Sequence, residues 1–166
     1  TGYFVTYKNT DPLFSVDLSD PENPKVLGEL KITGFSSYLH FYGENRLLGI
    51  GWETDPDTGN TIGMKCSMFD ISDPSDVKET DRFVLKDVSF CDALTNYRSI
   101  LAAPKKGLFG FAYGMYGSNS DIYDSSENFY YSVFSFDEED GFVPNAYVKM
   151  NDCGLFDDRM EWQDYR

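Results

Sequence analysis

A short motif occurs three times along the chain, and it constrains the fold more than any other feature. Residues 14–21 read Phe-Ser-Val-Asp-Leu-Ser-Asp-Pro, and residues 67–74 read Ser-Met-Phe-Asp-Ile-Ser-Asp-Pro. These two copies align without a gap at an offset of 53 residues, and a looser third copy occupies residues 132–138. Each copy reads as a strand that ends in a turn, because Asp and Ser side chains bond nearby backbone amides and proline disfavours helix in the preceding residue. We therefore expect Asp17 and Asp70 to occupy equivalent positions.

The repeat length and the residue types together predict an all-β fold. A period of roughly 50 residues built on a strand-turn-strand unit is typical of a β-propeller. Aromatic residues, which favour strands, make up 17% of the chain, and helix signals are nearly absent. We predict a partial β-propeller built of four-stranded antiparallel blades.

The repeats divide the chain into consecutive blades of one segment, residues 1–166. The approximate blades are residues 1–36, 37–90 and 91–150, followed by a tail at residues 151–166. The first of these is a partial blade. A closed propeller needs at least about four blades, so we predict that the chain is a fragment of a larger propeller.

Alternating apolar residues and turn signals place the individual strands. Expected strands cover residues 3–7, 13–18, 25–32, 37–41, 46–52, 61–71, 77–85, 100–103, 108–113, 128–137 and 142–150. Val16 and Phe69 are equivalent in the repeat, and both are expected to be buried between adjacent sheets. Gly49 and Gly51 leave one face of their strand bare, which predicts the close approach of another backbone.

Several separated blocks, in the right order between about Tyr3 and Met150, resemble a known family. The blocks are residues 11–14, 17–21, 24–30, 34–40, 47–51, 68–74 and 93–98. The chain resembles bacterial secreted proteins with a C-terminal β-propeller domain distantly related to WD-40 repeats. It departs from the family pattern at Phe41, where a proline is expected, and at Arg166, beyond which the pattern continues. The resemblance implies a secreted or cell-surface partial propeller and transfers no catalytic residue.

Charge and hydropathy exclude several classes of partner. The formal net charge is −14, and such a surface repels phosphate backbones and anionic lipid. We therefore expect no nucleic-acid partner. No long apolar run is present, so we expect neither membrane insertion nor a signal peptide.

The cysteines and the single histidine carry structural predictions. Cys66, Cys91 and Cys153 form no disulfide framework and no zinc or redox motif, so burial as small hydrophobic residues is expected. His40 is expected to be a structural histidine that bonds the backbone. We assign no catalytic, cofactor-binding or metal-binding residue and expect no cofactor.

Two groups of polar residues are candidate sites. Glu53, Asp55, Asp57 and Asn60 fall in one hairpin, where alternating carboxylates could supply oxygen ligands to Ca²⁺, although the EF-hand spacing is not met. We expect a solvated, metal-free hairpin from Glu53 to Asn60. A second group, in and beside the long loop at residues 114–127, combines acidic residues with tyrosines. Sugar-binding and peptide-binding surfaces have this composition, and so does an ordinary solvated loop. Its members are Asp121, Asp124, Glu127, Tyr116, Tyr123 and Tyr130.

The function predicted from these features is a non-catalytic, extracellular or cell-surface module for protein or glycan binding, or for scaffolding. The alternative is a propeller-type enzyme, such as a glycosidase, whose site is completed by blades absent from this chain. A binding module should expose an aromatic patch, whereas an enzyme should bring together carboxylates of raised pKa. We also expect the isolated chain to self-associate through open blade faces, or to fold its terminal segments near Tyr3 and Trp162 over them.

Overall fold

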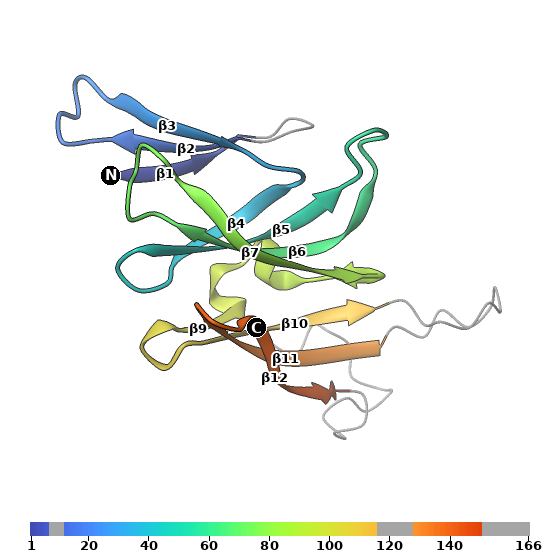
Figure 1. The fold of residues 1–166 in the computed structure, drawn as a ribbon. Coiled ribbons are helices and arrows are strands. Elements are labelled where there is room, and N and C mark those ends of the chain that lie inside the picture. Colours follow the sequence, from blue (N-terminus) through green and yellow to red (C-terminus); the bar gives the residue numbers. More distant parts are fainter. Residues whose placement is uncertain (7–11, 116–127, 151–166) are drawn as a thin grey trace.

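The three copies of the motif lie in three antiparallel sheets that are stacked face to face (Figure 1). The computed structural model describes residues 1–6, 12–115 and 128–150. The strands in these residues are β1 (Gly2–Val5), β2 (Pro12–Asp17), β3 (Lys25–Lys31), β4 (Phe35–Phe41), β5 (Arg46–Thr54), β6 (Thr61–Asp70), β7 (Lys78–Lys86), β8 (Val88–Phe90), β9 (Ile100–Ala103), β10 (Leu108–Met115), β11 (Asn128–Asp137) and β12 (Gly141–Lys149).

The first sheet has the order β1-β2-β3 and the second has the order β4-β5-β6-β7. The third has the order β12-β11-β10-β8, with β9 also paired to β10. Helical structure in the described residues is limited to three short 3-10 turns, at Asp92–Leu94, Tyr97–Ser99 and Pro104–Lys106. The predicted all-β fold is confirmed.

The internal repeat is visible in the strand register and in the turns. Asp17 and Asp70 each end a strand, and the register pairs each of them with the lysine that begins the next strand. Each carboxylate accepts a 2.9 Å hydrogen bond from the backbone amide two residues on, at Ser19 and Ser72. Asp137 accepts amides of its own turn in the same way. The predicted equivalence of Asp17 and Asp70 is therefore confirmed.

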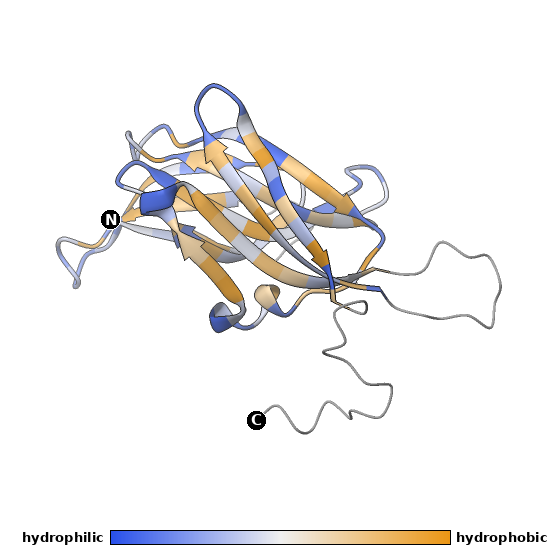
Figure 2. Cartoon of the chain, turned by 90° about the horizontal axis from the view of Figure 1, so that it is seen from below, coloured by the Kyte–Doolittle hydropathy of each residue, from blue (hydrophilic) through white to orange (hydrophobic). Residues whose placement is uncertain are grey.

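Two hydrophobic clusters hold the stack together, and apolar residues follow the strands while the turns are hydrophilic (Figure 2). The cluster between the first and second sheets has the buried members Leu13, Leu47, Phe69, Ile71 and Val77. The larger cluster between the second and third sheets includes Leu48, Ile50, Met64, Cys66, Met68, Phe109, Phe111, Phe134 and Phe136. The second sheet is thus buried on both faces.

Strand alternation explains why one half of the burial prediction is right and the other is wrong. Phe69 is fully buried against the first sheet, as expected. Val16 is only half-buried, because Leu13 and Ser15 occupy the face of β2 that packs on the second sheet. Successive side chains point to opposite faces, so Val16 points away from the stack.

The glycines of β5 allow the close approach that was predicted. A Cβ atom on Gly51 would overlap the carbonyl group of Phe35, and one on Gly49 would lie 2.6 Å from Oγ of Ser36. The crowding neighbour is β4, whose register with β5 shifts between Ser36 and Tyr38. Any larger residue at either glycine would push the two strands apart.

The structure adds details that hydrophobic alternation does not reveal. Strand β4 begins at Phe35, and the three-residue strand β8 pairs with β10 in the third sheet. Phe41 ends β4 and pairs with Leu47, so the position where a proline was expected is part of the strand ladder.

Tyr3 lies in β1, and its ring meets the ring of Phe41 edge-on at a centroid distance of 6.0 Å. Trp162 lies outside the described residues.

The replacement Phe69→Ala should lower the free energy of unfolding by about 3–5 kcal/mol, because it leaves a cavity between two sheets. The matched replacement Val16→Ala should cost under about 1.5 kcal/mol, because the side chain is half exposed. Urea denaturation of both variants gives these values. Equal losses for the two variants would show that these two equivalent positions are packed alike.

Candidate functional site

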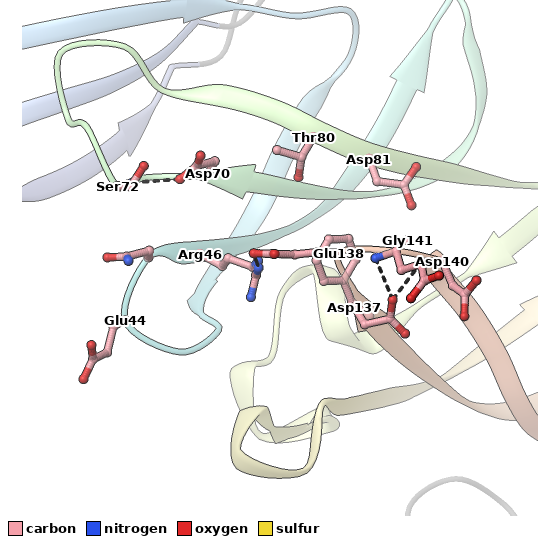
Figure 3. Close-up of a pocket in the computed structure, with 13 residues that line it drawn as sticks. Glu44, Arg46, Asp70, Ser72, Thr80, Asp81, Asp137, Glu138, Asp140 and Gly141 are labelled. Carbon is pink, nitrogen blue, oxygen red and sulfur yellow. Dashed lines mark hydrogen bonds and ion pairs between the residues drawn. The ribbon is translucent and has the colours of Figure 1, made fainter.

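A pocket of about 770 Å³ opens between the second and third sheets (Figure 3). It lies where the β4–β5 turn, the end of β6 and the middle of β7 face the β11–β12 turn. Its lining residues are Glu44, Asn45, Arg46, Asp70, Ser72, Thr80, Asp81, Phe136, Asp137, Glu138, Glu139, Asp140 and Gly141. Seven of these carry carboxylates and one carries a guanidinium group, so the pocket is strongly acidic.

Asp81 joins the two sheets at this pocket. Its carboxylate accepts the Phe142 amide of β12 at 2.7 Å and the Arg82 amide of its own strand at 2.8 Å. Gly141 sits beside it at a φ of +67°, and a Cβ atom there would collide with the Asp81 carboxylate. Only glycine satisfies both the backbone angle and the contact. The Asp81–Phe142 bond is called the inter-sheet bridge below.

Two further carboxylates are occupied by turns. Asp137 accepts the amides of Glu139 and Asp140 at 2.9 and 2.7 Å. The backbone hydrogen bond from Ser72 lowers the pKa of Asp70 from its ordinary value. A general acid requires the opposite shift, so Asp70 is suited to a structural role rather than to glycoside hydrolysis.

The remaining four carboxylates of the pocket differ in whether they have a charged partner. Glu138 forms an ion pair with Arg46, whose guanidinium group also lies 5.5 Å from the centre of the Phe136 ring. The side chains of Glu44, Glu139 and Asp140 make no hydrogen bond or ion pair to other described residues. These three free carboxylates give the pocket an uncompensated negative charge.

A second pocket, of about 370 Å³, lies between β7 and strands β10, β11 and β12 of the third sheet. Its lining residues are Leu85, Tyr113, Ser132, Phe134, Pro144, Asn145, Ala146 and Tyr147. The rings of Tyr113 and Tyr130 stack 5.7 Å apart, and Tyr130 lies 6.4 Å from Tyr147. We call Tyr113, Tyr130 and Tyr147 the tyrosine row. It runs from the buried Tyr113 to Tyr147, which is 73% exposed.

The two pockets flank the inter-sheet bridge along the same pair of strands. On β7 the acidic pocket touches Asp81 and the second pocket touches Leu85; on β12 they touch Gly141 and Tyr147. Both β7 and β12 are outer strands in the order of their sheets. An acidic surface and an aromatic surface therefore lie next to each other along one side of the molecule.

A buried ion cluster lies on the other face of the second sheet and was not predicted. Lys65 is 1% exposed, and its ammonium group lies 3.7 Å from Glu53 and 4.0 Å from Glu79. Arg82 lies 3.4 Å from Glu53 and 3.7 Å from Glu79, which makes the cluster neutral. Burial lowers the pKa of Lys65, and the two glutamates oppose that shift.

The ion cluster also connects the second sheet to the segment between β3 and β4. Lys65 donates a hydrogen bond to the carbonyl group of Thr33, and Arg82 donates one to the Thr33 hydroxyl at 3.1 Å. A lysine in a strand of otherwise buried residues was the only sequence signal for this cluster. Glu53 lies 12 residues before Lys65, and Glu79 lies 14 residues after it. These side chains meet because β5 and β7 pair with β6 on either side, and that pairing cannot be read from the sequence spacing.

The acidic hairpin does not bring its candidate calcium ligands together. Glu53 points into the buried ion cluster instead of toward the hairpin tip. Asp55 is used by the turn, because its Oδ1 accepts the amides of Asp57 and Thr58 at 2.9 and 2.8 Å. Among residues 1–6, 12–115 and 128–150, no group of three or more His, Cys, Asp or Glu side chains is arranged to hold a metal ion.

The single histidine and two of the cysteines pack against neighbouring residues. The predicted backbone partner of His40 is wrong: its Nδ1 lies 2.9 Å from the Tyr38 hydroxyl, and the two rings stack 5.9 Å apart on one face of β4. Cys66 and Cys91 are buried as predicted, and burial raises the pKa of Cys91 to about 11. Cys153, Tyr116, Asp121, Tyr123, Asp124 and Glu127 lie outside the described residues.

Comparison with known proteins identifies one family. A family model described as a beta propeller domain matches residues 1–165. A relative from Archaeoglobus fulgidus, named only as an uncharacterized protein, is 46% identical over 116 residues, which are 70% of this chain and 17% of the relative. Uncharacterized protein MJ1554 of Methanocaldococcus jannaschii is 46% identical over 108 residues, or 65% of this chain and 16% of the relative. No solved structure matches significantly.

These comparisons support the propeller part of the expected resemblance. Both relatives are archaeal, so they do not support its bacterial part. The chain spans about one sixth of the length of each. In the part of the chain that the structure describes, no helix is long and apolar enough to cross a membrane.

The calcium prediction can be tested directly. Millimolar Ca²⁺ should leave the melting temperature of the chain unchanged, because Glu53 and Asp55 are already engaged. The variant Asp57→Ala serves as the control and should behave in the same way. A large rise in melting temperature with Ca²⁺ that disappears in Asp57→Ala would reverse this assignment.

The lowered pKa of Asp70 predicts a pH-dependent contribution to stability. A carboxyl group whose pKa is lower in the folded state stabilises the fold above its unfolded pKa of about 3.9, and this contribution is lost as the pH falls through the folded pKa. Asp70→Asn should therefore be less stable than the parent chain at pH 7, and the difference should shrink below about pH 3. Urea denaturation at several pH values measures it, with Asp140→Asn as the control. A difference that is constant with pH would contradict the assignment.

Proposed function

The chain belongs to the beta propeller domain family, and on this basis we propose that it is a non-catalytic binding and scaffolding module for a protein partner. The proposed ligand is an extended segment of the partner that carries both basic and apolar side chains. The observation that supports this most directly is the position of the acidic pocket and the tyrosine row on either side of the inter-sheet bridge.

The acidic pocket suits lysine or arginine side chains. Glu44, Glu139 and Asp140 are not neutralised by neighbours in the described residues, and the whole chain carries a net charge of −14. Such a field draws in a cationic segment and speeds its association. The fixed carboxylates of Asp81 and Asp137 keep the pocket walls in place through bonds to backbone amides.

The tyrosine row suits the apolar part of the same segment. Tyrosine provides large contact area at a low cost in side-chain entropy, and it is enriched at binding hot spots. Tyr147 is the most exposed of the large hydrophobic residues in the described ranges, and the second pocket opens beside it. The exposed ring of Tyr147 supports a binding module, for which an exposed aromatic surface is expected.

A carbohydrate is the second candidate ligand. Asn145 adds a side-chain amide beside the exposed ring of Tyr147, and this combination of groups also suits a sugar. The acidic pocket next to it favours a basic segment of a protein. A glycan microarray tests the second candidate independently.

We further propose that the module works in a secreted or cell-surface protein. This location rests on the family resemblance of the sequence blocks, and the acidic surface is compatible with it. Fractionation of cells that produce a full-length relative, followed by detection in membrane, cytosol and medium, tests the location.

Selection of a phage-displayed random peptide library on the purified chain tests the proposed ligand. Enriched peptides should combine Lys or Arg with aromatic or aliphatic residues. Tyr147→Ala and the double variant Glu139→Gln/Asp140→Asn should each weaken binding of a selected synthetic peptide by about tenfold, because one removes a hot spot and the other removes two attractive charges.

Matched controls lie elsewhere on the surface. Tyr97→Ala removes another tyrosine that is 64% exposed, and Glu22→Gln/Asp57→Asn removes two carboxylates outside the pocket. Both controls should bind the selected peptide as the parent chain does. Failure to enrich any peptide, or equal loss in the controls and the pocket variants, would refute the proposed site.

A further inference from the structure

The outer edge of β12 presents backbone groups that the third sheet does not use. Along a strand, the backbone N–H and C=O groups of successive residues point alternately to its two sides. Phe136 of β11 donates its N–H to the carbonyl group of Gly107, which lies next to β10. Because β11 pairs with β10 without a register shift, Ser132, four residues before Phe136, also directs its backbone groups toward β10.

The strand register transfers this direction to β12. Ser132 pairs with Tyr147, so the N–H and C=O groups of Tyr147 point away from β11 and toward the outer edge. Phe142 confirms the direction, because it pairs with Phe136 and its outward N–H reaches the Asp81 carboxylate at 2.7 Å. Among the described residues, none bonds the outward backbone groups of Tyr147.

This edge lies at the side of the stack and not at one of its end faces. The corresponding outer strand of the second sheet is β7, and that sheet has another sheet packed on each of its faces. Even so, no described strand extends the second sheet beyond β7. A sheet packed on the outer face of the third sheet would likewise leave the edge of β12 accessible.

The two ends of β12 have different surroundings. Near its end, the side chain of Tyr147 is 73% exposed and the second pocket opens beside it. At its beginning, Gly141 borders the acidic pocket and its free carboxylates. The partners of Tyr147 and Gly141 on β11 are Ser132 and Asp137, so about five residues, or roughly 17 Å of strand, separate the two surroundings.

We infer that the bound segment adds a strand to the third sheet, antiparallel to β12, with its apolar side chains N-terminal to its basic ones. This inference rests on the proposed function and adds the conformation, direction and residue order of the ligand. Tyr147 supplies one N–H and one C=O for main-chain pairing, and antiparallel pairing is the more stable geometry. Because β12 runs from the acidic pocket to the tyrosine row, an antiparallel segment meets the tyrosine row first and the acidic pocket about five residues later.

The inter-sheet bridge limits the length of the added strand. The outward N–H of Phe142 is already bonded to Asp81, and Pro144 has no N–H to donate. Main-chain pairing is therefore confined to the part of β12 around Tyr147. The basic end of the segment passes the bridge and reaches the acidic pocket through its side chains, so the affinity depends on the residues at both ends.

Two synthetic peptides of identical composition test the direction. One has the order Leu-Tyr-Leu-Ser-Thr-Ser-Lys-Arg and the other has the reverse order, and both have acetylated and amidated ends so that terminal charges do not differ. Fluorescence polarisation measures their binding to the full 166-residue chain at about 0.15 M salt. The first peptide should bind about tenfold more tightly, because only its order matches both surfaces in the antiparallel direction.

Changes to the backbone test the added strand itself. Tyr147→Pro and Tyr147→Ala both remove the ring, but only the proline removes the outward N–H, and proline is tolerated at such an edge position. The proline variant should bind the first peptide about fivefold more weakly than the alanine variant. In the peptide, an N-methyl group should weaken binding by a similar factor at one of two adjacent apolar residues and not at the other, because only alternate amides face β12.

The outcomes separate this inference from the proposed function. Equal binding of the two peptides, or tighter binding of the reversed one, would overturn the inferred direction, while a loss of binding in Tyr147→Ala would still support the proposed surface. Equal tolerance of N-methyl groups at adjacent residues would overturn the added strand. Binding of neither peptide would also overturn the inference, and the library selection would then decide the proposed function separately. Circular dichroism shows whether each variant is folded, and the N-methylated peptides need no variant.

Discussion

The second sheet is buried on both of its faces, and this arrangement determines how the other two sheets pack. One face presents Leu47 and Phe69 to the first sheet, and the other presents Leu48 and Met68 to the third. Because strand side chains alternate, neighbouring residues of β5 and β6 serve different interfaces. The central strands β5 and β6 therefore contain long runs of buried residues. Glycines interrupt these runs where another strand approaches closely, and Lys65 interrupts them where the buried ion cluster neutralises its charge.

The acidic pocket follows from how the sheets end. Each motif copy stops its strand at an aspartate that bonds the amides of the next turn, so carboxylates collect where the turns of adjacent sheets meet. Asp81 then connects the second sheet to the third through the amide of Phe142. The carboxylates that hold turns are fixed, whereas the side chains of Glu44, Glu139 and Asp140 make no ion pair within the described residues. The repeat thus collects acidic side chains on one surface of the stack.

The proposed ligand surface and the two end faces of the stack occupy different parts of the molecule. A segment of a partner would lie along the outer strands, where Tyr147 and the free carboxylates are exposed. The end faces expose Val26 and Val148. The two surfaces share no residue.

The all-β class, most of the strands and the equivalence of Asp17 with Asp70 could be predicted from the sequence, because repeats, alternation and turn chemistry are local properties. The burial of Phe69, Cys66 and Cys91 and the crowding at Gly49 and Gly51 were predictable in the same way. Which face of each strand meets a neighbour depends on the tertiary structure, in which Val16 is half exposed and Glu53 lies beside Lys65. It alone brought Arg46 to Glu138 and Asp81 to Phe142, residues 92 and 61 positions apart. Those contacts depend on how whole sheets stack, and a pattern that repeats every few residues carries no record of that geometry.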